Sequence, residues 1–187
     1  MVISLNNSHE AFDELMYNGG DYDKGVYLME SLKMFAYSRT ATLIALSNMD
    51  HALWDVQPPG YPNTIRWNAG HVYITAEDFL HKADHQYVIK HPEWIDLFID
   101  GTRPSAWEGS VPTIDAITEA LQEQEERIQH KLGNKLQQPA SEEHRIRTLD
   151  LDTVDAALQF VTWHEGIHLG IIKSLSIAMD EMQNAPV

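Results

Sequence analysis

The sequence of 187 residues contains no cysteine. A disulfide scaffold, a thiolate-ligated metal site and a cysteine nucleophile are therefore all excluded. The first fifteen residues contain no basic segment followed by an apolar run, so they do not form a secretory signal. The lack of cysteine fits a reducing compartment, and we expect a cytoplasmic protein.

Long apolar runs and positive charge are also scarce. No apolar stretch approaches the ~20 residues that a membrane-spanning helix needs. Lys and Arg number 13 against 28 Asp and Glu, which gives a formal net charge of −15. A surface this acidic repels phosphate backbones and anionic lipids. We therefore predict a small-molecule substrate and neither nucleic acid nor a membrane as a partner, and we leave a homodimer open.

Four segments repeat apolar residues at the helical period of three to four. Asn63 and Asp152 are the expected N-caps of the second and fourth segments, and Gly133 ends the third. We predict helices over residues 26–54, 64–82, 113–132 and 152–182. The sequence therefore favours an all-α protein.

The rest of the chain connects these helices. A short helix is expected at 92–99 inside the connection 84–111, and a brief extended piece at 144–149. Four amphipathic helices in a chain of this length predict one domain over residues 1–187 with four-helix bundle architecture. The long connection between the second and third helices leaves the helix order in space undetermined.

Two histidines, His164 and His168, are spaced four residues apart in the fourth segment. Residues four apart on a helix project in similar directions, about 6 Å apart along the axis, so both imidazoles can reach one ion. Their neighbours Val161, Ile171 and Ile172 are apolar, which predicts that both histidines point into the bundle. Two adjacent buried imidazoles favour a shared metal ion. The alternative is a pair of core histidines bonded to backbone or water.

His81 and His85 have the same spacing and provide an internal comparison. Their neighbours are Lys82, Asp84 and Gln86, at the end of the second segment. This polar setting indicates two solvated histidines without a native metal ion.

A third ligand is expected from another helix. His71 lies between Trp67 and Ile74 in the apolar face of the second segment. We predict that His71, His164 and His168 converge, with their nearest ring nitrogens about 3–3.5 Å apart. Three neutral imidazoles suit Zn²⁺, Ni²⁺, Co²⁺ or Fe²⁺, with water or substrate in the open positions.

Residues 164–168 also match His-Glu-x-x-His, the helix of zinc proteases. The longer form of that motif fails here, because Ile171 and Ser174 occupy the positions of its Gly and third His. No edge strand that could bind a peptide is evident. We therefore do not predict a protease. Glu165 remains a candidate catalytic base or a carboxylate that orients an imidazole, and the alternative is a solvent-facing glutamate.

Two segments together resemble the DinB/YfiT-like family. They are Asn-Thr-Ile-Arg-Trp-Asn-Ala-Gly-His-Val at 63–72 and Trp-His-Glu-Gly-Ile-His-Leu-Gly at 163–170, and Trp54 with Gln-Pro-Pro at 57–59 adds to the likeness. The resemblance implies a four-helix bundle with one metal ion held by a histidine triad, which falls on His71, His164 and His168. Some relatives transfer thiols such as bacillithiol, mycothiol or glutathione, or isomerise substrates with a thiol cofactor. Others have no assigned reaction.

Three functions follow as hypotheses. In the first, a metal-dependent S-transferase uses a low-molecular-weight thiol as cosubstrate against an electrophilic small molecule, which a chain without cysteine permits. In the second, a metal-dependent hydrolase activates water, with Glu165 as a base. In the third, the chain is a non-catalytic, stress-related scaffold with a structural metal. Arg39, in the first apolar stripe, either binds an anionic group of a cofactor or extends to solvent.

Overall fold

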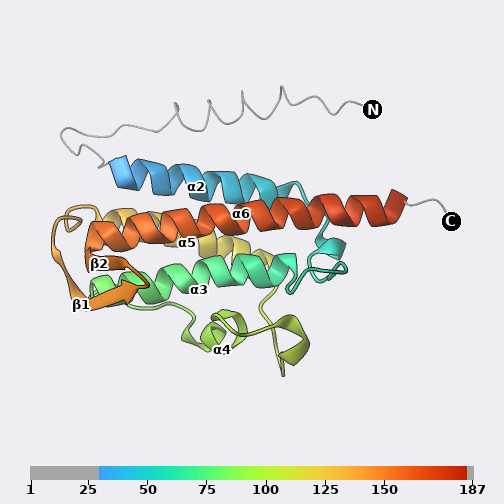
Figure 1. Ribbon diagram of the computed structural model, residues 1–187, viewed down its shortest axis with the longest axis horizontal. Helices are drawn as coiled ribbons and strands as arrows, with labels where there is room; N and C mark the ends of the chain where they lie inside the picture. The colour runs from blue at the N-terminus through green and yellow to red at the C-terminus, as the bar shows by residue number, and fades with distance from the viewer. Residues whose placement is uncertain (1–29, 185–187) are drawn as a thin grey trace.

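Four long helices form a bundle in the computed structural model, which describes residues 30–184 (Figure 1). They are α2 (Glu30–Ser47), α3 (Ile65–Ala83), α5 (Ile114–Leu132) and α6 (Val154–Asn184). The predicted all-α bundle is confirmed. The predicted start of the first helix at residue 26 lies outside the described residues. None of the described helices is both long and apolar enough to cross a membrane.

The first helix ends earlier than its apolar pattern predicts. α2 stops at Ser47, and a separate 3-10 turn covers His51–Leu53. The carboxylate of Asp50 caps this turn by accepting a hydrogen bond from the amide of Ala52 at 2.9 Å. The chain can start a separate turn here because the side chain of Asp50 satisfies the amide of Ala52, which would otherwise have no partner at the beginning of the turn.

The predicted caps at Asn63 and Asp152 are each wrong by one residue. Thr64 caps α3 by accepting from the amide of Trp67 at 3.2 Å. Thr153 accepts from the amide of Ala156 at 3.1 Å at the start of α6. In both places a threonine hydroxyl directly follows the predicted cap and takes its role.

The connections contain short elements. The predicted short helix is present as a 3-10 turn at Pro92–Trp94 and α4 at Ile95–Phe98, and a further 3-10 turn covers Pro104–Ala106. The extended piece is larger than predicted. It is an antiparallel hairpin of β1 (Pro139–Ile146) and β2 (Leu149–Thr153), which packs against α3 and α6.

Helices α3 and α5 are neighbours that run in the same direction (Figure 1). Near their first residues, Arg66 donates to the carbonyl of Pro112 at 2.6 Å, and beyond their last residues Lys135 pairs with Asp84 at 2.5 Å. Parallel neighbours cannot be joined by a tight hairpin, so the connection must return along the bundle. This explains its length, and it carries α4 across the outer side of α3.

The interior consists of two apolar clusters with a polar layer between them. One cluster includes Trp54, Trp67 and Ile172, and the other includes Phe35, Leu80 and Leu158. On α2, α5 and α6 the residues between the clusters are Arg39, Gln124 and Glu165, all buried.

Gly70 allows α4 to approach α3 closely. A Cβ atom at this position would lie 2.5 Å from the ring of Phe98. We therefore expect Gly70→Ala to displace the ring of Phe98 and to lower the free energy of unfolding by roughly 1–3 kcal/mol, as overpacking does. Urea unfolding measures the change. Gly166→Ala is the matched control, because a Cβ there meets no atom within 4 Å and alanine favours the helix. Equal stability of the Gly70→Ala and wild-type proteins would contradict the close approach.

Candidate metal centre

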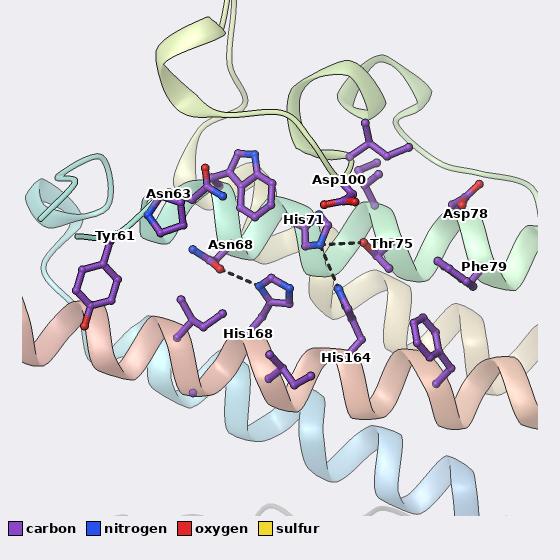
Figure 2. Close-up of a pocket in the computed structure, with 18 of the residues that line it drawn as sticks. Tyr61, Asn63, Asn68, His71, Thr75, Asp78, Phe79, Asp100, His164 and His168 are labelled. Atoms are coloured by element: carbon purple, nitrogen blue, oxygen red, sulfur yellow. Dashed lines mark hydrogen bonds between the residues drawn. The ribbon is translucent and has the colours of Figure 1, made fainter. Parts of the chain in front are cut away.

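Three histidines meet where α3 faces α6 (Figure 2). His71 comes from α3, and His164 and His168 come from α6. One potential ligand atom from each lies within 4.8 Å of the others, and the Nε2 atoms of His71 and His164 are 3.2 Å apart. The predicted convergence is confirmed. Of the three pairs, that of His71 and His164 is shown to fall in the predicted range of about 3–3.5 Å, whereas the three ligand atoms together lie within the wider limit of 4.8 Å.

The fourth helix is rotated relative to the prediction. Glu165 is buried and continues the interior stripe of Val161 and Ile172, whereas His164 and His168 are half-buried. Both histidines face another helix of the bundle, but Glu165 and not either histidine takes the central position. They lie on the flank of α6 that faces α3, because adjacent helix positions differ by about 100° in direction.

In His71 and in His168, one ring nitrogen lies within hydrogen-bond distance of an oxygen atom that acts as the acceptor. Nδ1 of His71 lies 2.7 Å from the carbonyl oxygen of Phe98, and Nδ1 of His168 lies 2.8 Å from Oδ1 of Asn68. A carbonyl oxygen can only accept, so each Nδ1 carries the proton and each Nε2 keeps its lone pair. This arrangement of ligand and orienting oxygen is the one that metal-binding histidines use. The donor set therefore fits a divalent ion.

Burial keeps these imidazoles neutral. It lowers the pKa of His71, and it lowers the pKa of His164 to about 4 and that of His168 to about 3, with the neighbouring histidines adding to both effects. Neutral imidazoles are the form that binds metals. The site is thus ready to take an ion at neutral pH without first losing protons.

The lowered pKa values predict a pH-dependent stability of the metal-free protein. Below pH ~6.5 the unfolded chain takes up protons on His164 and His168 that the folded chain does not, because the folded pKa values are lower. Their contribution to stability is complete above pH ~6.5 and is lost as the pH falls toward 4. Urea unfolding of chelator-treated protein between pH 4.5 and 7 measures the slope.

The control for that slope is His168→Asn, which removes one titrating group. Its slope should be shallower by up to about 1.4 kcal/mol per pH unit. Identical slopes for the variant and the wild-type protein would show that His168 is protonated in the folded state as easily as in the unfolded one.

Asn68 is expected to strengthen metal binding without touching the ion. Its Oδ1 fixes the ring and the tautomer of His168, and it lies three residues before His71 on the same face of α3. Asn68→Ala should lower the affinity for Zn²⁺ about 10- to 100-fold, the usual effect of removing such a partner. Competition with a chromophoric chelator measures it. Asn63→Ala is the control, because Asn63 lines the same pocket and its Oδ1 has no hydrogen-bond partner. Equal losses in the two variants would contradict this role.

The triad opens into a pocket of about 850 Å³ between α3, α6 and the segment after α4. Most of its exposed wall is apolar, although polar side chains such as Asn68, Thr75 and Asp100 surround the triad (Figure 2). The apolar side chains are Trp67, Ile74, Phe79, Ile99, Ile146, Phe160, Ile167 and Ile171. An ion held by three histidines would therefore keep open positions toward a space that fits a small molecule.

Arg39 and Glu165 do not line this pocket. Arg39 is 0% exposed and forms two hydrogen bonds with the carboxylate of Glu165, at 2.9 and 3.0 Å. Its Nη1 donates to the carbonyl of Leu121 at 2.6 Å, and its Nη2, which also donates to Glu165, donates to the amide oxygen of Gln124 at 2.9 Å. The alternatives that Arg39 extends to solvent and that Glu165 faces solvent are both wrong. The pair occupies the polar layer of the core.

His81 and His85 have partners of their own outside the pocket. Nδ1 of His81 lies 2.9 Å from the carbonyl of Tyr87, and Nε2 of His85 lies 2.7 Å from a carboxylate oxygen of Glu142. Within residues 30–184, the cluster with the spacing of a metal site is the triad alone.

Sequence reasoning missed Asn68, Thr75 and Asp100. Asn68 and Thr75 lie three residues before and four after His71, so helical spacing places them on its face. Thr75 Oγ1 is 3.5 Å from Nε2 of His71. Asp100 comes from the irregular connection, where no periodic pattern indicates a position near the site.

These features define a class of protein. It is a helical bundle in which two helices direct three imidazoles toward one point at the floor of an apolar pocket. A family model described as the DinB superfamily matches residues 34–172, which include all three histidines. The chain belongs to the DinB superfamily. No curated protein matches the chain.

Proposed function

We propose that this protein binds one divalent metal ion through His71, His164 and His168 and transfers a low-molecular-weight thiol to an electrophilic small molecule. The observation that carries the proposal is the meeting of three neutral imidazoles at the floor of an apolar pocket. Zn²⁺, Ni²⁺, Co²⁺ and Fe²⁺ suit such ligands. The ion would lower the pKa of a thiol beside it, so that thiolate is available at neutral pH.

The chain's own residues have three roles in this proposal. Asn68 and the carbonyl of Phe98 orient the imidazoles of His168 and His71. The apolar wall, which includes Phe79 and Phe160, holds the electrophile and excludes water, which would compete with the thiol. In the reaction the thiol sulfur forms a bond to the electrophilic carbon. The leaving group departs with its bonding electron pair, and the thiol proton passes to solvent.

A hydrolase that activates water is the second candidate. The open pocket supports it as much as it supports thiol transfer. Its proposed base, Glu165, is held by Arg39 inside the bundle and does not line the pocket. This geometry favours the transferase over a hydrolase that depends on Glu165. A scaffold with a structural metal is the least favoured, since a closed ligand shell would serve it better.

The test combines metal-loaded protein, a chromogenic electrophile and individual thiols. Protein loaded separately with Zn²⁺, Ni²⁺, Co²⁺ or Fe²⁺ is incubated with 1-chloro-2,4-dinitrobenzene and bacillithiol, mycothiol or glutathione. We expect product to form faster than without protein with at least one metal and thiol, and the acceleration to disappear in His164→Ala.

A control variant and a spectroscopic measurement accompany this test. The His85→Ala variant should keep the wild-type rate, because His85 pairs with Glu142 away from the pocket. Thiol addition should also change the visible spectrum of the cobalt-loaded protein. Absence of both the spectral change and the acceleration with every thiol would reject the transferase. Faster hydrolysis of an activated ester by the metal-loaded protein would then support the hydrolase.

A further inference from the structure

The ionised side chains that line the pocket are all carboxylates. Its wall contains the carboxylates of Asp78 and Asp100, and within the described part of the chain neither lysine nor arginine lines it. A pocket for an anionic molecule would be expected to present a cation, usually arginine. The charges of the pocket wall therefore indicate the charge of the molecule that binds there.

The two cations that α3 carries beside its histidines, Arg66 and Lys82, are engaged elsewhere. Lys82 pairs with Asp78 at 2.6 Å, which compensates that carboxylate. Arg66 pairs with Asp55 at 2.6 Å, and Arg39 is enclosed in the core. Asp100 is exposed and is the carboxylate of the wall without a protein partner, since none of the hydrogen bonds or ion pairs among residues 30–184 involves its side chain and Arg103, the next cation along the chain, does not line the pocket.

The chain is anchored to α3 on both sides of Asp100. The carbonyl of Phe98, two residues earlier, accepts from His71 at 2.7 Å. Thr102, two residues later, accepts from the indole of Trp67 at 2.9 Å. Both anchors are residues of α3 that line the pocket, so the turn holding Asp100 is tied to the wall beside the triad (Figure 2).

The carboxylate of Asp100 lies near the triad but outside it. Its negative charge raises the pKa of both His71 and His164, against the larger effect of burial. It is not part of the cluster whose ligand atoms lie within 4.8 Å of one another. A group bound between the triad and Asp100 thus has imidazoles on one side and a carboxylate on the other.

We propose that the molecule that enters this pocket carries a positively charged group, such as a protonated amine, and places it against Asp100. The proposal rests on the proposed function and narrows its thiol to an aminothiol. The sulfur faces the triad, the cation faces Asp100, and the apolar wall contacts the rest. Asp100 is the specificity-determining residue, and thiols that carry an anion in place of this cationic group are disfavoured.

The test uses three thiols of nearly equal size whose distal charge differs. Cysteamine carries a cation, 2-mercaptoethanol is neutral and 3-mercaptopropionate carries an anion. Their dissociation constants for the cobalt-loaded protein are measured by visible spectroscopy in wild type, Asp100→Asn and Asp96→Asn. Asp96 is the matched control, because it is an exposed aspartate of α4 that does not line the pocket.

Each thiol is compared between variants, so that the different pKa values of the thiols themselves cancel. We expect Asp100→Asn to weaken cysteamine about fivefold, to strengthen 3-mercaptopropionate by a similar factor and to leave 2-mercaptoethanol unchanged. The effects should shrink at high salt. Asp96→Asn should change none of them. Equal effects of Asp100→Asn on all three thiols, or no effect, would overturn the proposal.

A second series of ligands that contain no thiol distinguishes failure of thiol transfer from failure of the proposed charge preference. Benzyltrimethylammonium, benzyl alcohol and benzenesulfonate are titrated into zinc-loaded protein and followed by calorimetry. If no thiol changes the cobalt spectrum but the cation still depends on Asp100, the transferase is rejected and the charge preference stands. If benzenesulfonate binds as well as the cation in wild type, the charge preference is rejected.

Discussion

Replacing His164 by alanine is expected to lower the affinity for Zn²⁺ by at least about a hundredfold. The variant keeps two imidazoles, and even the loss of a residue that only orients a ligand costs 10- to 100-fold. The Nε2 atoms of His164 and His71 are 3.2 Å apart, so the variant removes one member of a closely spaced pair of nitrogens. Competition with a chromophoric chelator at pH 7.5 gives the dissociation constants. The bound metal is counted independently by elemental analysis of gel-filtered protein.

The matched controls for this prediction are His81→Ala and His85→Ala. These residues repeat the spacing of His164 and His168, yet their nitrogens contact Tyr87 and Glu142. Both variants should bind one equivalent of Zn²⁺ with wild-type affinity. Loss of metal in either control, with retention in His164→Ala, would show that the site lies elsewhere.

His164→Ala should still fold without metal. The two apolar clusters are built without the triad, so the bundle does not need the ion as a core. Circular dichroism of the chelator-treated variant should therefore show wild-type helix content. A loss of helix content would mean that weak metal binding reports unfolding instead of a missing ligand.

The helices and the triad could be predicted because both depend on local spacing. Period three to four marks each long helix, and an i, i+4 pair of histidines needs only a helix to bring its rings together. His71 was found because it stands in an apolar face. The resemblance of the two histidine segments to the DinB/YfiT-like family added weight to the same three residues.

The details that depend on packing could not be predicted in this way. His164, Glu165 and His168 lie close together on α6, and the sequence does not show which of them turns inward. Arg39 determines which of the three turns inward, because its guanidinium in α2 forms an ion pair with Glu165 and holds it inside the bundle. The two residues are 126 positions apart, so local sequence patterns do not reveal the pair. Asp100 belongs to an irregular connection whose path depends on Gly70 and Trp67 of another helix.

Replacing Arg39 by alanine is expected to lower the free energy of unfolding by roughly 3–5 kcal/mol. Glu165 is 1% exposed, and without its partner it would leave an uncompensated charge in the core, the usual reason that breaking a buried ion pair is so costly. Gln124 and the carbonyl of Leu121 would also lose hydrogen bonds. Urea unfolding at pH 7.5 without metal measures the change. The control is Arg145→Ala, whose pair with Asp150 is exposed to solvent, so its loss should change the stability far less.

The double variant Arg39→Met with Glu165→Leu separates the structural role of Glu165 from a catalytic one. Replacing both charges by apolar side chains removes the buried charge itself, so the double variant should be more stable than Arg39→Ala alone. If Glu165 only sets the rotation of α6, the double variant keeps its zinc affinity and its thiol transfer, because apolar packing can hold the same helix face inward. If Glu165 acts as a base, the folded double variant binds zinc normally and loses turnover at every pH. A double variant no more stable than Arg39→Ala would show that the hydrogen bonds of Arg39 to Leu121 and Gln124, more than the unpaired carboxylate, account for the loss.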